Sequence, residues 1–497
     1  MKPNRRGAVA AVAVIWGAMA IASSAQTLTT LASFNGSDGS GPSAALIQGP
    51  DGKFYGTTSG GGPNEPNGGG TVFEISSIGE ITDLYFFCSQ SGCTDGSTPD
   101  AGLVLGIDGN FYGTTSLGGA NGHYGTIFKI TPSGNLTTLY SFCGQALCTD
   151  GGYSTGGLIQ GPDENFYGTA FAGGIGDAQW CSGGCGTVFK ITPQGTYTVL
   201  HSFAGYNTEG AGPSAGLVLG RDGNFYGTTT NGGAHNECPL GCGTVFKITP
   251  KGTLTTLYSF CAQQGCTDGS APYAGLTFAR DGNFYGTTSN GGTKGAGTAF
   301  KITPAGMLTT MYNFCSQTNC SDGQMPEGGL LQATDGNVYG TVPIGGAYTA
   351  GSIFTIGSTG VLTTLYSFCS NGYPDCLDGS KPYAGLFQST NGKLYGTTSG
   401  GGIFGYCCGT VFSVDMGLGP FVSFVRNPAK VGQSFGILGN GLKGTTAVLL
   451  NGTAASFTVR SDTLLVAKVP AGATSGYVSI TTSRGVLKSN IPFYVMP

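Results

Sequence analysis

Charge is scarce in this chain, and so is histidine. Lysine and arginine number 21 and aspartate and glutamate 25 among 497 residues, so charged residues make up 9% and the net charge is −4. This balance lacks the basic surface that nucleic-acid binding requires, so we expect neither DNA nor RNA as a partner. With three histidines and no Ser/His/Asp, paired-carboxylate or phosphate-loop motif, no catalytic constellation can be assembled and no cofactor is expected.

Long apolar runs are also lacking, apart from one near the N-terminus. Residues 1–25 place Lys2, Arg5 and Arg6 before a small apolar run, Ala8–Ala22, and end in Ser-Ser-Ala. This order is typical of a secretory signal peptide that is cut before Gln26, and the run is too short and rich in alanine for a membrane span. We therefore expect a secreted or periplasmic protein whose mature chain has no membrane span.

Repetition dominates the rest of the chain. Between Gln26 and Asp415 four short phrases recur in seven copies, and the clearest copy reads GLVLGRDGNFYGTTTNGG, CGTVFKITPKG and LTTLYSF. Each copy has one marker tyrosine in its FYGTT phrase: Tyr55, Tyr112, Tyr167, Tyr226, Tyr285, Tyr339 and Tyr395. A period of about 54 to 59 residues with four β-rich phrases is typical of one four-stranded propeller blade.

The seventh copy is divided between the two ends of the repeat array. Its last phrase is Leu28–Phe34, and its first three phrases begin at Gly385. A closed ring can complete its last blade with a strand from the other chain end, which removes an exposed sheet edge. The sequence therefore predicts an all-β fold: a seven-bladed β-propeller over residues 26–416 in which the N-terminal strand closes the last blade.

The connections between the phrases predict two unequal faces. We name the phrases A (GLVLG), B (NFYGTT), C (GTVFKI) and D (LTTLYSF); in an up-and-down meander the A–B and C–D turns emerge on one face and the B–C and D–A loops on the other. The first set consists of short DGN and TPxG turns, and we call that side the turn face. The second set varies in length, and we call its side the loop-rich face. If the protein binds a ligand we expect the contacts on this face, from His123, Tyr124, Trp180, His235 and Tyr406.

The sixteen cysteines occur in close pairs within the variable loops. Five pairs follow phrase D and three precede phrase C: Cys88/Cys93, Cys143/Cys148, Cys261/Cys266, Cys315/Cys320, Cys369/Cys376, and Cys181/Cys185, Cys238/Cys242, Cys407/Cys408. Because a repeat that lacks one partner lacks both, we predict eight local disulfides, with the adjacent Cys407 and Cys408 the doubtful pair. Zinc held by His235, Cys238 and Cys242 is the competing interpretation, although we expect no metal.

An acid followed by glycine recurs in all seven D–A loops. The set is Asp38, Asp95, Asp150, Glu209, Asp268, Asp322 and Asp378, and rotational symmetry would place it as a ring on the loop-rich face. Each carboxylate can accept backbone N–H groups of its own turn, which is the simpler interpretation. The alternative is a shared anionic rim that attracts cations, although a wide ring would hold its members too far apart for one ion.

The repeated phrases resemble the GloVer tandem repeat of secreted bacterial proteins that use various anchoring devices (choice-of-anchor proteins). The resemblance implies an extracytoplasmic repeat protein and no catalytic residues; this chain shows no C-terminal sorting signal.

From about Leu418 the period stops, and short alternating strands predict an immunoglobulin-like β-sandwich over residues 418–497. This part is similar to the IPT/TIG domain at Gly439–Leu442, Val448–Gly452, Val469–Gly472 and Gly476, which implies a spacer or adhesion module.

These observations favour a secreted, non-catalytic protein that binds a glycan or an extracellular protein at its loop-rich face. Two alternatives remain open: a carbohydrate-active lyase or hydrolase that uses acids such as Asp95 or Asp268, and a purely structural envelope component. An active site usually needs residues that break the repeat symmetry, whereas these acids belong to the repeat.

Overall fold

The computed structural model describes residues 27–64, 68–176, 181, 183–205, 209–357, 359–405 and 407–496. Within these ranges the fold is all-β, with four-stranded antiparallel sheets as its main unit. Seven such sheets lie between Leu28 and Val414, each built like a propeller blade from the four phrases of one repeat. The predicted signal peptide lies outside the described residues.

The four phrases become four strands in every repeat. Phrase A forms β2 (Ile47–Gln48), β6 (Val104–Leu105), β10 (Ile159–Gln160), β14 (Val218–Leu219), β18 (Thr277–Phe278), β22 (Leu331–Gln332) and β26 (Phe387–Gln388). Phrase B forms β3 (Phe54–Thr58), β7 (Phe111–Thr115), β11 (Phe166–Ala170), β15 (Phe225–Thr229), β19 (Phe284–Thr288), β23 (Val338–Val342) and β27 (Leu394–Thr398).

The outer two strands follow the same scheme. Phrase C forms β4 (Thr71–Ile75), β8 (Thr126–Ile130), β12 (Thr187–Ile191), β16 (Thr244–Ile248), β20 (Thr298–Ile302), β24 (Ser352–Ile356) and β28 (Thr410–Val414). Phrase D forms β5 (Ile81–Phe86), β9 (Leu136–Ser141), β13 (Tyr197–Ser202), β17 (Leu254–Ser259), β21 (Leu308–Asn313), β25 (Leu362–Ser367) and β1 (Leu28–Ser33). Four D–A loops contain a short 3₁₀ helix: η1 (Ser91–Cys93), η2 (Ala146–Cys148), η3 (Gln264–Cys266) and η4 (Thr318–Cys320).

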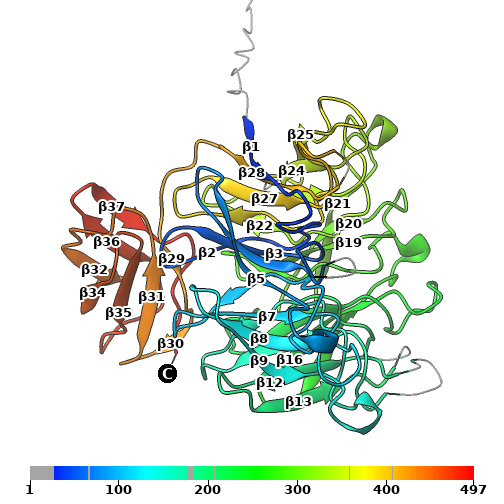
Figure 1. Ribbon diagram of the computed structural model, residues 1–497, viewed down its shortest axis with the longest axis horizontal. Coiled ribbons are helices and arrows are strands. Elements are labelled where there is room, and N and C mark those ends of the chain that lie inside the picture. Colours follow the sequence, from blue (N-terminus) through cyan, green and yellow to red (C-terminus); the bar gives the residue numbers. More distant parts are fainter. Residues whose placement is uncertain are drawn as a thin grey trace, which may run out of the picture.

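The divided repeat is joined as the sequence predicts. Strand β1 pairs antiparallel with β28, from Leu28 opposite Val414 to Ser33 opposite Thr410, and the sheet order is β1-β28-β27-β26. Figure 1 shows the blue first strand beside the yellow last strands of the array. The N-terminal strand therefore covers the edge that β28 would otherwise expose.

Contacts between sheets come from the B strands, which are buried almost throughout. Tyr55 stacks on Phe111 of the next sheet with ring centroids 4.1 Å apart, and Tyr395 of the last sheet lies 4.2 Å from Phe54 of the first. A threonine of each B strand also donates to a carbonyl oxygen of the next sheet, as Thr57 does to Ala101 (3.0 Å). These threonine bonds occur in every sheet and return from the last to the first.

A glycine two residues before strand A explains how closely the sheets approach. A Cβ atom at Gly216 would lie 2.5 Å from the carbonyl oxygen of Gly157, which has the same place in the preceding repeat. Real Cβ atoms do not approach backbone oxygens so closely, so glycine allows these neighbouring segments to touch.

The C-terminal region, residues 418–496, forms two further four-stranded sheets around one apolar core that includes Phe435, Leu465 and Ile480. One sheet has the order β29-β31-β35-β34 and the other β33-β32-β36-β37, while β30 and β38 form a parallel pair. The strands are β29 (Ser423–Phe424), β30 (Ala429–Lys430), β31 (Ser434–Leu438), β32 (Ala447–Leu450), β33 (Thr453–Ala454), β34 (Phe457–Val459), β35 (Leu464–Lys468), β36 (Val478–Thr482), β37 (Gly485–Lys488) and β38 (Val495–Met496).

The C-terminal region docks on the turn face. In each repeat, the residue two positions after strand A either bonds to this region or lines a cleft shared with it: Pro50, Ile107, Pro162, Arg221, Arg280, Thr334 and Thr390. Figure 1 shows the orange and red strands as a lobe on one side of the repeat sheets. The sequence suggests that the turn face is uniform and closed. In the structure this face binds a second folded unit, the C-terminal region.

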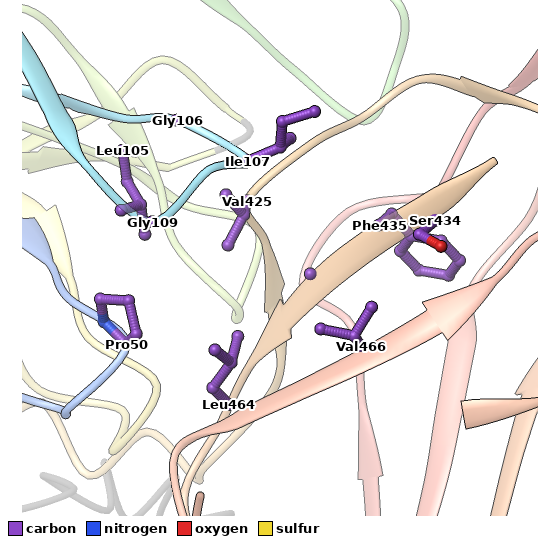
Figure 2. Close-up of a pocket in the computed structure, with 11 residues that line it drawn as sticks. Pro50, Leu105, Gly106, Ile107, Gly109, Val425, Ser434, Phe435, Leu464 and Val466 are labelled. Atoms are coloured by element: carbon purple, nitrogen blue, oxygen red, sulfur yellow. The ribbon is translucent and has the colours of Figure 1, made fainter. Parts of the chain in front are cut away.

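Apolar packing accompanies these bonds. Val425, Leu438 and Leu464 of the C-terminal region join the same buried cluster as Tyr55 and Leu105 of the first two repeats. Figure 2 shows the adjoining cleft, in which Pro50, Leu105 and Ile107 face Val425, Leu464 and Val466. A shared apolar cluster holds the two parts together by removing side chains of both from water.

Candidate functional site

The variable loops meet on one face, as predicted. In every repeat a residue of the D–A loop forms a β-bridge with a residue of the B–C loop, for example Ser97 with Leu117 and Ser380 with Gly400. In Figure 1 the short coiled segments of the D–A loops lie on the far side from the C-terminal lobe. The loop-rich face is therefore the one that the C-terminal region leaves uncovered.

The predicted cysteine pairing is confirmed. All eight local pairs are disulfides, including Cys407–Cys408, and no cysteine is free among the described residues. Each bond closes a short segment of a B–C or D–A loop. Such disulfides fit a protein that resides outside the cytoplasm.

The cysteines lie in the B–C and D–A loops, as the sequence predicts, and several of their side chains are buried there. Cys185 is only 2% exposed and Cys376 only 1%. Because disulfide sulfur is apolar, it packs beneath the loop: Cys185 joins a buried cluster with Val188 and Phe203. The carbonyl oxygen of Cys376 accepts the backbone N–H of Gly379 (2.8 Å) inside its own loop. Five other cysteines are buried as well: Cys181, Cys242, Cys261, Cys369 and Cys408. These side chains brace the loops from within and offer a ligand no contact.

Five of the seven repeated acids are buried inside their own loops: Asp95, Asp150, Asp268, Asp322 and Asp378. Asp322 is typical, since its carboxylate accepts bonds from Tyr312 Oη (2.7 Å) and from the backbone N–H groups of Ser316 (2.8 Å) and Gln317 (3.2 Å). The carboxylates thus satisfy loop donors, as the simpler interpretation of this pattern requires. These five side chains do not offer a shared anionic surface.

Burial and the hydrogen bond to the loop carboxylate raise the pKa values of the D-strand tyrosines. Burial, together with the hydrogen bond to Asp95, raises the pKa of Tyr85 to about 12. In the third repeat His201 replaces this tyrosine, and its Nε2 lies 3.2 Å from Glu209 Oε2. The nearby imidazole of His201 lowers the pKa of Glu209. Asp38 accepts the N–H of Asn35 (2.8 Å) in a more open loop.

The structure describes three of the five predicted ligand contacts, and these three lie in two different repeats. His123 is exposed, and the half-buried Tyr124 packs edge-on against Tyr153 of the next repeat, with ring centroids 5.3 Å apart. His235 is half-buried in the loop between β15 and β16, two repeats away from His123. Trp180 and Tyr406 lie outside the described residues.

A set of side chains that differs from repeat to repeat lies four residues before the A strands. Each member lies five residues after the acid of its D–A loop, and we call them the mouth residues: Ser43, Asp100, Thr155, Ser214, Tyr273, Glu327 and Tyr383. In all seven repeats both flanking residues are buried while the mouth residue is exposed or half-buried, although the Oγ atom of Ser43 itself is buried. Neighbouring positions are linked, since Thr155 Oγ1 donates to Ser214 O (2.9 Å) and Ser214 Oγ to Tyr273 O (3.1 Å).

Two carboxyls among the mouth residues are perturbed by burial. Burial raises the pKa of Asp100, which accepts a hydrogen bond from Ser116 Oγ (2.8 Å). Burial also raises the pKa of Glu327. Burial and the negative charge of Glu327 raise the pKa of Tyr383. The mouth residues therefore combine carboxyl, phenol and hydroxyl groups, and none of the seven carries a positive charge.

The mouth residues are not among the site residues predicted from the sequence, because that prediction rests on features that the repeats share. The signal was the variable position inside an otherwise repeated segment, acid-Gly-x-x-Pro-x-small-small-Leu in most copies. The variable position alternates with apolar or small neighbours, and this alternation predicts that its side chain is exposed. Only the assembly of the seven sheets decides whether these positions lie near one another.

The family model described as Gloeobacter/Verrucomicrobia repeat matches residues 16–239, 149–267 and 239–427. No curated protein matches the chain. Within the described ranges, no helix is long and apolar enough to cross a membrane.

Of three solved structures that match this chain, one has a TM-score above 0.5. A fungal alcohol oxidase of the AA5 family, in complex with copper, is 14% identical with a TM-score of 0.53, covering 95% of this chain and 100% of its own. A putative gluconolactonase is 11% identical with a TM-score of 0.37, covering 80% of this chain and 94% of its own. A protein of unknown function from Bacteroides thetaiotaomicron is 14% identical with a TM-score of 0.38, covering 78% of this chain and 76% of its own.

The mouth residues do not fit the copper that the alcohol oxidase binds. Copper in proteins is usually held by imidazole nitrogen together with oxygen or sulfur donors, and the seven mouth residues include no imidazole. The three histidines of the chain, His123, His201 and His235, belong to three different repeats. The likeness is therefore one of fold.

Proposed function

Because this chain belongs to the Gloeobacter/Verrucomicrobia repeat family, we propose that it is an exported, non-catalytic binding protein. Its architecture in this proposal is a closed seven-bladed propeller followed by an IPT/TIG-like sandwich. The threonine bonds that run through all seven sheets and return to the first support closure. The two C-terminal sheets around one core support the sandwich.

The mouth residues carry the proposal. Their neighbours repeat, their own identities differ, and they reach solvent on the face that the C-terminal region leaves uncovered. A ring of identical repeats presents a symmetric surface, whereas a specific ligand needs different groups at different places. The mouth residues are positions at which the symmetry of the repeats is broken.

The chemistry of the mouth residues favours a neutral glycan as the ligand. Tyr273 is exposed and Tyr383 partly so, and tyrosine rings stack on sugar faces while their hydroxyls form hydrogen bonds. Asp100 and Glu327 can accept or donate hydrogen bonds to sugar hydroxyls. An acidic glycan is disfavoured because no mouth residue is a cation.

A glycan array with residues 26–497 tests this proposal. The double variant Tyr273→Ala/Tyr383→Ala should weaken binding of a neutral glycan by about tenfold or more and leave the melting temperature unchanged. Tyr348→Ala is the matched control, since Tyr348 is a half-exposed tyrosine of a B–C loop outside the mouth residues and should bind as the parent does. Absence of any glycan binding, or equal binding by the double variant, would contradict the proposal.

A carbohydrate-active enzyme is the second candidate, and the raised pKa values of Asp100 and Glu327 favour it, because a general acid needs a carboxyl that stays protonated. Incubating the bound glycan with the protein separates the two functions. Turnover that Asp100→Asn or Glu327→Gln abolishes would replace the binding proposal with this one. Binding without products would exclude the enzyme.

A further inference from the structure

One repeat differs from the other six in its cysteines. The sheet β14 to β17 alone has a pair in the B–C loop, Cys238 and Cys242, and a second pair in the D–A loop, Cys261 and Cys266. The competing zinc interpretation of the sequence paired His235 with the first two. The structure brings Cys261 and Cys266 of the D–A loop next to Cys238 and Cys242 of the B–C loop.

The four sulfur atoms form one cluster. All four Sγ atoms lie within 4.8 Å of one another, and those of Cys238 and Cys261, which belong to different disulfides, are 3.7 Å apart. In a tetrahedral zinc site with Zn–S bonds of about 2.3 Å, neighbouring sulfurs lie about 3.8 Å apart. The distance between the Sγ atoms of Cys238 and Cys261 is thus already close to the sulfur–sulfur distance in a zinc tetrathiolate.

The spacing and the surroundings also suit a metal. Three and four residues separate the members of the two pairs, within the range usual for structural zinc sites. Cys242 and Cys261 are buried and the other two are half-buried, in a cluster with Val245 and Phe260 that keeps bulk water from the sulfurs. Backbone bonds hold both loops, as from Gly241 N to Cys238 O (3.0 Å) and from Gly269 N to Cys266 O (2.9 Å).

We infer that Cys238, Cys242, Cys261 and Cys266 form a zinc site when their disulfides are reduced. A dithiol reductant delivers two electrons and two protons to each disulfide and is itself oxidised to a disulfide. The four thiols then lose their four protons as Zn²⁺ binds. The metal replaces two bonds within loops by one cross-link between the B–C and D–A loops.

Cobalt provides the test, because Co²⁺ bound by four thiolates has an intense visible spectrum. Residues 26–497 are reduced with dithiothreitol, freed of the reductant without oxygen, and titrated with Co²⁺ and then Zn²⁺. We expect one metal ion per chain, a tetrahedral thiolate spectrum, and displacement of Co²⁺ by Zn²⁺. Native mass spectrometry should give the same stoichiometry.

Two double variants identify the ligands. Cys261→Ser/Cys266→Ser should weaken metal binding by on the order of a thousandfold, because two of the four thiolates are lost. Cys315→Ser/Cys320→Ser removes a D–A pair from a repeat that has no B–C pair, and it should bind metal as the parent does. Cys238→Ser/Cys242→Ser repeats the first test from the other loop, and circular dichroism verifies that each reduced protein is folded.

Three outcomes would overturn the inference. They are a folded reduced protein that binds no metal, metal binding that the Cys315/Cys320 variant loses equally, and a stoichiometry of several ions per chain. The last would mean that single cysteine pairs suffice and that the four-sulfur cluster has no special role.

Discussion

The two faces of the repeat sheets are built from the same chain but held in different ways. On the turn face the connections are short and alike, and the residues that follow the A strands contact a separate C-terminal region. On the loop-rich face five of the seven D–A loops each contain a disulfide and a buried carboxylate of their own, as Cys315–Cys320 and Asp322 do in one of them. Short, similar turns thus hold differing residues, such as Arg221 and Thr390, against the C-terminal region, and the loops of the other face hold the differing mouth residues.

This difference places the residues of the proposed binding site on one face. The turn face buries part of its surface against the C-terminal region, including the cluster of Tyr55, Leu105 and Leu464. The loop-rich face exposes the mouth residues and contains the four-sulfur cluster. Four substitutions test how separate the two faces are.

The largest loss of stability should come from a substitution in the segments before the A strands, where neighbouring repeats touch. Gly216→Ala would place a Cβ atom 2.5 Å from Gly157 O, so the neighbouring A-strand segments must move apart. We expect the free energy of unfolding to fall by about 3 kcal/mol, measured by chemical denaturation of residues 26–497. Gly329→Ala is the control at the same repeat position, where a Cβ atom meets nothing within 4 Å. Equal losses in both variants would show that close approach does not explain this glycine.

The next effect concerns the loop-rich face alone. Asp322→Ala removes the acceptor of Tyr312 and of two backbone N–H groups in a buried loop. We expect a loss of about 2 kcal/mol in the free energy of unfolding. Asp38→Ala, in the more open loop, should cost less than half as much. If the two losses are alike, burial of the carboxylate does not brace these loops.

A smaller effect should appear on the turn face. Arg280 donates to Asn490 O (2.6 Å) of the C-terminal region and to Ala333 O (3.0 Å) of the next repeat. Arg280→Ala should cost about 1 kcal/mol and speed hydrogen exchange in β29 and β38, with no change in exchange in the D–A loops. Lys251→Ala, an exposed C–D turn residue, is the control. Unchanged exchange in both strands would mean that Arg280 does not hold the C-terminal region.

The smallest effect depends on pH. Asp83 has threonine as its counterpart in most other repeats, and among the described residues its Oδ1 atom is buried without a hydrogen-bond partner. Burial, and then the charge of Asp38, raises the pKa of Asp83 to about 6. Since the folded state holds this proton more tightly than the unfolded state, Asp83 costs stability above pH 6, and the cost disappears as the pH falls toward 4.

Asp83→Thr should therefore raise the free energy of unfolding at pH 8 by roughly 1 kcal/mol, a value reduced for solvent screening, and by nothing near pH 4. Denaturation at both pH values measures the difference. A gain that does not change with pH would show that packing, and not the charge of Asp83, is responsible.

Short-range patterns in the sequence determined most of the repeat structure. Alternating β-branched and aromatic residues between Gly, Asp and Asn turns predicted the four strands of each copy, and the divided copy predicted the pairing of β1 with β28. The spacing of cysteines predicted seven of the disulfides and left Cys407–Cys408 doubtful, and the meander predicted which loops meet. These features depend on residues that are near in sequence or related by the repeat.

Only the tertiary structure decided where unlike parts meet. The contact of Arg221 with Tyr494 joins segments that no local pattern relates, so the docking of the C-terminal region could not be predicted from periodicity. The same holds for the mouth residues, whose identities differ from repeat to repeat and whose proximity requires seven assembled sheets. Cys238 and Cys261 lie on loops of one repeat, yet their 3.7 Å separation depends on how strands β15, β16 and β17 lie side by side. Sequence patterns report local geometry, whereas these contacts arise from packing between elements.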